Sequence, residues 1–100
     1  MIYNELTAEL FGSMLRTGAA RLLAEKEKIN SLNVFPVPDG DTGDNMYMTI
    51  KGGVSAIENC AEERLGDYAA VLSRGMLLGA RGNSGVILSR LFAGISKAFA

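Results

Sequence analysis

Apolar residues recur at spacings of three and four along most of this chain, and that periodicity limits its possible folds more than any other feature. It predicts amphipathic helices in four segments, and no stretch alternates as a half-buried strand would. The segments run from about Asn4 to Lys28, from near Thr42 to about Ala61, from Asp67 to Leu78, and from near Ser84 to Ala100. The predicted fold class is therefore all-α.

Each predicted helix has an apolar face and a candidate capping residue. Asn4 or Thr7 would cap the first helix, Asp67 the third and Ser84 the fourth. Gly12 and Gly18 would let a neighbouring helix approach the first one closely. The predicted core-facing residues are Leu6, Leu10, Phe11, Met14, Leu15 and Leu22, then Met46, Ile50, Val54 and Ile57, then Tyr68, Val71, Leu72, Gly75 and Met76, and finally Val86, Ile87, Leu88, Leu91, Phe92, Ile95 and Phe99.

Composition excludes several classes of function. A net charge of −1 provides no basic face for nucleic acid, and no apolar run reaches the roughly 18 residues of a membrane span. Cys60 is the single cysteine, which rules out an internal disulfide and a zinc set and fits a reducing, cytoplasmic setting. Histidine is absent, so chemistry here must use carboxylates, backbone amides and a metal, which suits phosphoryl transfer.

The loop between the first two predicted helices has the chemistry of a cation site. Asp39 and Asp41 are separated only by Gly40, so one turn would bring two carboxylates close together. Adjacent anions repel unless a cation lies between them, and Mg²⁺ prefers such oxygen ligands. A calcium-binding helical hand is excluded, because Ile50 occupies the position of its essential glutamate. The alternative is an ordinary acidic turn, for which these residues are also suited.

The segment 79–85, with the letters GARGNSG, has the parts of an anion-binding loop. Glycines let backbone amides approach a ligand, and a following helix offers free N–H groups at its positive end. It is not a Walker A loop, because no lysine follows Gly85. The alternative is a plain glycine-rich connection. Together the two loops favour metal-bridged nucleotide phosphates.

The run 33–46, with the letters NVFPVPDGDTGDNM, and the run 79–85 identify a family resemblance. They resemble the nucleotide-binding domain of the dihydroxyacetone kinase L-subunit family, and within it the bacterial fatty acid kinase A subunits. The resemblance implies an antiparallel barrel of about eight helices. Residues 1–100 would supply roughly its first four, and the periodicity that persists at Ala100 predicts that the domain continues.

The resemblance also implies roles for particular residues. Asp39 and Asp41 would be catalytic and would hold two Mg²⁺ ions that bind the phosphates of ATP. Asn33 stands nearest to a third acidic ligand of the family, and Asp44 stands where a neutral residue is usual. The remaining phosphate or metal neighbours would be Thr42, Asn45, Gly82, Asn83, Ser84 and Gly85.

The implied activity is phosphorylation of a fatty acid, presented by a separate fatty-acid-binding protein, to give an acyl phosphate. The alternatives are a dihydroxyacetone kinase-type phosphotransferase, a non-catalytic nucleotide- or metal-sensing module, and a helical interaction domain. Half a barrel would leave apolar helix faces without partners, so residues 1–100 alone are expected to be inactive. Pairing of two copies as a homodimer would cover those faces and stays open.

Overall fold

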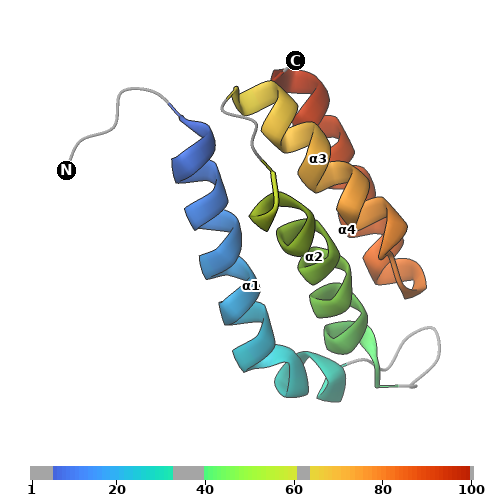
Figure 1. Cartoon of the computed structure of the whole chain (residues 1–100). Helices are drawn as coiled ribbons and strands as arrows, with labels where there is room; N and C mark the ends of the chain where they lie inside the picture. The colour runs from blue at the N-terminus through green and yellow to red at the C-terminus, as the bar shows by residue number, and fades with distance from the viewer. Residues whose placement is uncertain (1–5, 33–39, 61–63, 100) are drawn as a thin grey trace.

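The computed structural model describes residues 6–32, 40–60 and 64–99. Within these ranges every regular element is an α-helix: α1 (Ala8–Ser31), α2 (Thr42–Glu58), α3 (Leu65–Leu78) and α4 (Gly82–Phe99). Successive helices run in opposite directions (Figure 1). The ends of α1 and α3 and the beginnings of α2 and α4 therefore lie at one end of the bundle. The predicted all-α class is confirmed.

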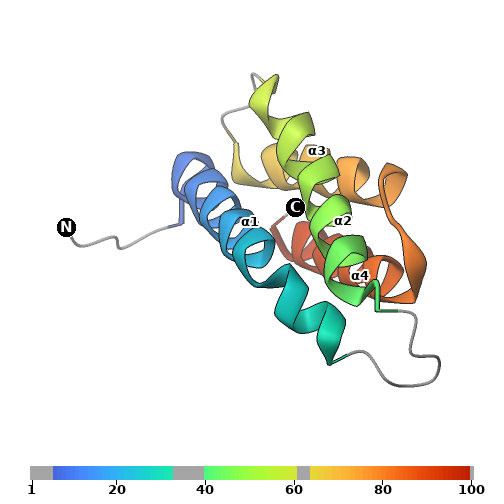
Figure 2. The same ribbon diagram turned by 90° about the horizontal axis from the view of Figure 1, so that it is seen from below.

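Helix α2 is the central element of the bundle. It packs against α1 on one side and against both α3 and α4 on the other (Figure 2). Helices α3 and α4 also pack against each other, whereas α1 touches α3 only slightly. No helix in the described part of the chain is long and apolar enough to cross a membrane.

The bounds of α1 differ from the predicted ones at its C-terminal end. Thr7 caps the helix, and its Oγ1 accepts a hydrogen bond from the amide of Leu10 at 3.1 Å. The alternative cap, Asn4, lies outside the described residues. The helix continues past Lys28 to Ser31, whose Oγ donates to the Lys28 carbonyl at 2.7 Å. This local bond satisfies a carbonyl that a helix ending at Lys28 would have left open.

The next two helices also shift at their ends. Helix α2 begins at Thr42, as predicted, and ends at Glu58, while the predicted end at Ala61 lies outside the described residues. Asp67 is not the cap of α3, so that prediction was wrong. Arg64 occupies the cap position with extended backbone, and Asp67 lies in the first turn, 3.9 Å from the Arg64 guanidinium. A carboxylate also suits that position, because it complements the positive end of the helix.

The prediction that Ser84 caps α4 was also wrong. The helix begins earlier, at Gly82, which has a φ of 65°. Glycine adopts this left-handed conformation without steric cost, so the chain can turn sharply at the entry to the helix. Ser84 is consequently inside the first turn, where its hydroxyl is directed to another helix.

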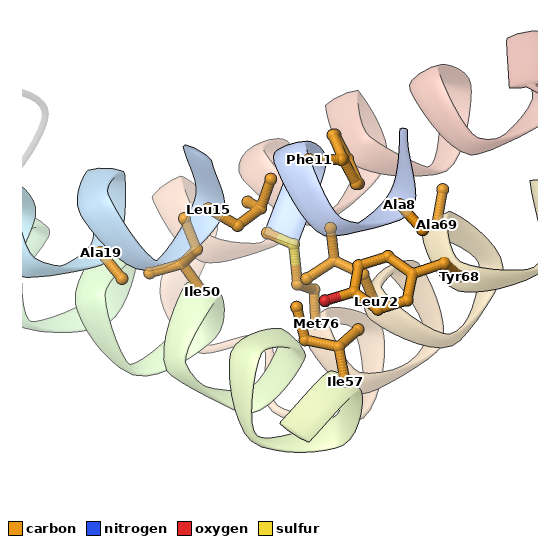
Figure 3. Close-up of a cluster of buried hydrophobic side chains, with 10 residues drawn as sticks. All are labelled: Ala8, Phe11, Leu15, Ala19, Ile50, Ile57, Tyr68, Ala69, Leu72 and Met76. Carbon is orange, nitrogen blue, oxygen red and sulfur yellow. The ribbon is translucent and has the colours of Figure 1, made fainter. Parts of the chain in front are cut away.

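The core lies among α1, α2 and α3, with α4 covering one side. Figure 3 shows its buried side chains. They are Ala8, Phe11, Leu15, Ala19, Ile50, Ile57, Tyr68, Ala69, Leu72 and Met76. On α4, Leu88, Phe92, Ile95 and Phe99 pack partly against this cluster.

The predicted apolar faces of α1 and α4 were partly wrong. Leu6 and Met14 are 36% and 54% exposed. On α4, the exposed fractions of Val86, Ile87 and Leu91 lie between 47% and 69%. On α1 the buried face keeps the predicted Phe11 and Leu15 and adds Ala8, Gly12 and Ala19, whose small size lets neighbours approach. Spacing selects only the large apolar residues, whereas packing also selects small residues that leave room for the neighbouring helix.

Glycines set the closest approaches between helices. A Cβ on Gly12 would overlap the Tyr68 hydroxyl, so this glycine does admit a neighbour, as predicted. Gly18 has nothing within 4 Å of the corresponding position, so the prediction for Gly18 was wrong. Between α2 and α3, a Cβ on Gly52 would stand 2.9 Å from the Gly75 carbonyl oxygen. These two helices are therefore in backbone contact.

Candidate functional site

The beginnings of α2 and α4, each of which follows a segment predicted to be functional, lie at one end of the bundle (Figure 1). The Ser84 hydroxyl donates to the backbone carbonyl of Thr42 at 3.4 Å, across 42 positions of sequence. The contact joins the first turn of α4 to the first residue of α2. The antiparallel order of the helices thus brings together two segments that are far apart in the chain.

The glycines of the second loop allow α4 to approach α2 closely. A Cβ on Gly82 would overlap the Asn45 side chain, and a Cβ on Gly85 would overlap the Thr49 hydroxyl. Gly85 is buried, and its Cβ position is also only 3.4 Å from the Asn45 carbonyl oxygen. Asn45, Gly82 and Gly85 were all predicted site residues, and the structure places them together.

Thr49 connects the same two elements and was not predicted. It is fully buried, its hydroxyl donates to the Asn45 carbonyl at 2.8 Å, and Oγ1 accepts from the Arg81 amide at 3.1 Å. The side chain therefore anchors the backbone of the glycine-rich loop. The sequence does contain a signal for this role: Thr49 is a hydroxyl residue next to Ile50 on the apolar face of α2. A hydroxyl on a buried face needs a hydrogen-bond partner.

A second group of contacts attaches the beginning of α2 to the end of α1. Asn30 Oδ1 accepts hydrogen bonds from the amides of Gly43 at 2.8 Å and Asp44 at 3.2 Å. Its Nδ2 donates to Asp44 Oδ2 at 3.2 Å. Lys26 Nζ lies 3.1 Å from the other carboxylate oxygen of Asp44. The hydrogen bond with Asp44, and then its negative charge, raise the pKa of Lys26.

These contacts explain how an aspartate is accommodated at position 44. Its carboxylate is paired with a lysine and an amide on α1. Asn30 was not identified from the sequence. An asparagine in the last turn of a helix is common near a chain reversal, and no local pattern shows that it will bond to a different helix.

Asp41 occupies the cap position of α2 without acting as a side-chain cap. Its side chain makes no capping hydrogen bond, and the residue is exposed; only its backbone carbonyl is used, accepting from the Asn45 amide at 2.9 Å. Gly40, immediately before it, has a φ of 68°, which produces a sharp turn. Asp39 and Asn33 lie outside the described residues. Among residues 6–32, 40–60 and 64–99, no three His, Cys, Asp or Glu side chains form a group that could hold a metal.

The beginning of α4 keeps polar groups available. Asn83 is exposed, and within the described ranges no hydrogen bond uses its side chain or its amide. At the beginning of α2, by contrast, the amides of Gly43 and Asp44 are already bonded to Asn30. Free amides at the positive end of a helix attract anions, so α4 is the better suited of the two.

Comparison with known proteins identifies the domain. A family model described as the DAK2 domain matches residues 36–100. An uncharacterized protein of Staphylococcus saprophyticus is 48% identical over 94 residues, which is 94% of this chain and 17% of that protein. Uncharacterized proteins of Staphylococcus epidermidis and of Staphylococcus aureus strain USA300 are 47% and 46% identical, with the same coverage. The chain thus spans 17% of the length of these curated relatives.

The family model covers the second predicted functional loop and most of the first, including Asp39 and Asp41. The relatives at 46% to 48% identity extend the similarity over nearly the whole chain. The chain therefore belongs to the DAK2 domain family, which makes it a kinase-related module of the L-subunit type.

Proposed function

We propose that this chain binds ATP with Mg²⁺ and serves as the nucleotide-binding part of a phosphotransferase. The observation that carries the proposal is the contact of the beginning of α4 with α2, in which Ser84 is bonded to Thr42 and Arg81 to Thr49. A carboxylate-bearing loop and a glycine-rich helix beginning at one end of a bundle match the two needs of a metal–nucleotide complex. Family membership supports a kinase-related role for this arrangement.

In this proposal the phosphates bind at the beginning of α4. The amide and side chain of Asn83 are available there, and Gly82 and Gly85 let this end of α4 lie close against Asn45 and Thr49 of α2. Ser84 and Asn45 border the same place from α4 and α2. Hydrogen-bond donors fixed before the ligand arrives stabilise phosphate charge without a further cost of reorganisation.

Asp41, together with Asp39 and the amide of Asn33, would hold the cation. Asp41 fits this role because its carboxylate is exposed and makes no bond to the helix that it precedes. Asp44 is not assigned to the set, because Lys26 and Asn30 already pair with its two oxygens. Bound Mg²⁺ would supply positive charge that neutralises the phosphate oxygens.

For the whole reaction we propose the fatty acid kinase assignment: phosphorylation of a fatty acid on a separate fatty-acid-binding protein, giving an acyl phosphate. The support is the sequence PVPDGD at residues 36–41, which resembles that branch of the family. A nucleotide site of this kind would serve a dihydroxyacetone kinase equally well, so substrate must be tested separately.

Calorimetric titration of Mg²⁺-ATP into the chain tests the nucleotide site. Asp39→Asn with Asp41→Asn should weaken binding by about a hundredfold or more, since one charge pair near a protein surface is worth on the order of 4 kcal/mol at 4 Å. The matched control is Glu58→Gln with Asp67→Asn, which removes the same charge from exposed positions at the other end of the bundle. Equal binding by both variants, or no binding to a folded parent chain, would contradict the proposal.

Substrate is tested by ATP turnover with the complete protein that carries this domain. Palmitate on the fatty-acid-binding protein of the same cell should give a hydroxylamine-trappable acyl phosphate, whereas dihydroxyacetone should not be phosphorylated. The reverse result would select the dihydroxyacetone kinase alternative. Nucleotide binding without turnover on either substrate would indicate a sensing module.

A further inference from the structure

Asn30 supplies the cap that α2 lacks on its own. The residue at the cap position of α2, Asp41, makes no side-chain capping bond. The oxygen of Asn30 accepts from the amides of Gly43 and Asp44, which are among those that a cap normally satisfies. Asn30 belongs to the last turn of α1, so one helix caps the next across the intervening loop.

The same place is a backbone contact between the two helices. A Cβ on Gly43 would overlap the Lys26 carbonyl and would stand 2.9 Å from Lys26 Cα and 3.0 Å from Asn30 Oδ1. Gly43 is buried there. The segment that contains Asp39 and Asp41 connects α1 to α2 along the chain. The Asn30 side chain joins the same two helix ends directly.

The contact also determines where negative charge lies. Asn30 Nδ2 donates to one oxygen of Asp44, and Lys26 lies 3.1 Å from the other. Without them the Asp44 carboxylate would be free at the beginning of α2, one position before Asn45, which borders Gly82. A free carboxylate there would repel phosphate.

We propose that Asn30 is a positioning residue for the metal–nucleotide site. It acts through Gly43 and Asp44, setting the beginning of α2 and the exit of the aspartate loop, and it does not touch the ligand. This inference rests on the function proposed above, although its structural part can be measured without nucleotide.

The structural part is tested by amide hydrogen exchange in the chain without ligand. Asn30→Ala should speed exchange at Gly43 and Asp44 by about five- to tenfold, the effect of a lost helix cap. The matched control is Asn59→Ala, an exposed asparagine at the other end of α2, which should leave both amides unchanged. Unchanged exchange in Asn30→Ala would overturn the inference.

The functional part is tested by titrating Mg²⁺ at fixed ATP at a temperature where every variant is folded. Asn30→Ala should raise the Mg²⁺ concentration for half-saturation by roughly tenfold, comparable to the loss of a residue that orients a metal ligand. Asn59→Ala should not. A purely structural role would lower the melting temperature and leave the Mg²⁺ dependence of the folded protein unchanged, which would also overturn the inference.

An exchange of the two side chains gives a rescue test. In Asn30→Asp with Asp44→Asn, the carboxylate introduced at position 30 accepts from both amides and from the new amide at position 44, and Lys26 keeps a carboxylate within reach on its own helix face. Net charge is unchanged. We expect the Mg²⁺ concentration for half-saturation to lie within about twofold of the parent value, compared with a roughly tenfold increase in Asn30→Ala. Failure of the exchange to restore either amide protection or Mg²⁺ dependence would count against positioning by Asn30.

These results can be separated from those for the proposed function. If the parent chain binds Mg²⁺-ATP through Asp39 and Asp41 but Asn30→Ala behaves as the parent in both measurements, only the positioning role is wrong. If the parent does not bind, the proposed function is wrong, and with it the effect on Mg²⁺.

Discussion

At the scale of single residues, the beginning of α4 depends on one buried hydroxyl. Among the described contacts, Thr49 is the only hydrogen-bond partner of the Arg81 amide. The Thr49 side chain is fully buried. The bond is partly buried, so water would replace Thr49 only incompletely as the partner of this amide. Thr49 therefore contributes both to stability and to the position of the backbone that precedes α4.

Thr49→Val keeps the shape of the side chain and removes its hydroxyl. We expect a loss of about 1–2 kcal/mol in the free energy of unfolding, because the Arg81 amide is left unpaired. Ser89→Ala is the control: Ser89 is equally buried but donates only to the Val86 carbonyl within its own helix, so the expected loss is below about 1 kcal/mol. Urea denaturation followed by circular dichroism measures both, and equal losses would show that the Arg81 bond is unimportant.

At the scale of helices, glycines bring the backbones of α2 and α3 together beside the large side chains of the core. A Cβ on Gly75 would stand 2.7 Å from both the Ala56 Cβ and the Gly52 carbonyl oxygen, and 3.1 Å from Gly53 Cα. Glycine inside a helix costs roughly 1 kcal/mol relative to alanine. Here the close packing of the central helix against α3 offsets that cost.

Gly75→Ala should therefore destabilise the protein by about 1–3 kcal/mol, since α3 would have to move away from α2. Gly94→Ala provides the opposite case, because nothing lies within 4 Å of the added methyl group. It should stabilise by up to about 1 kcal/mol through helix propensity alone. Thermal unfolding of the two variants would contradict this interpretation if both shifted in the same direction.

At the scale of the whole molecule, the aromatic side chain of Phe11 links α1 to both α3 and α4. The Phe11 ring on α1 meets Tyr68 of α3 and Phe99 of α4 edge to face, with ring centroids 6.4 Å and 5.6 Å apart (Figure 3 shows Phe11 and Tyr68). Both pairs are at distances where such geometry is favourable. Phe11 thus connects α1 to two helices that it otherwise touches little.

Phe11→Ala should lower the free energy of unfolding by about 3–5 kcal/mol, as expected for a large buried ring. Met14→Ala on the same helix should change it by no more than about 0.5 kcal/mol, because Met14 is 54% exposed. Guanidinium denaturation of the pair distinguishes the two residues. A large loss in Met14→Ala would restore the face that periodicity predicted for α1.

Local signals predicted the helices well, and also the turns that precede α2 and α4. Periodicity located all four helices, and the chemistry of the segments at 39–42 and 79–85 located the turns now seen at Gly40 and Gly82, both with positive φ. Helix formation and sharp turns depend on neighbours within a few positions, so a single sequence contains that information. Errors occurred where neighbours were not local: Asp67 was displaced as a cap by Arg64, and Ser84 was drawn to Thr42.

By itself, then, the sequence determined the all-α class, the order of the helices and the candidate residues for the proposed site. Only the tertiary structure decided which side chains hold these parts in place. Asn30 reaches across 13 positions to Gly43, Thr49 across 32 to Arg81, and Ser84 across 42 to Thr42. In none of the three cases does the residue's own segment show which partner it will have. They matter because antiparallel packing places helix ends together, and buried polar groups at those ends must find a partner wherever the fold supplies one.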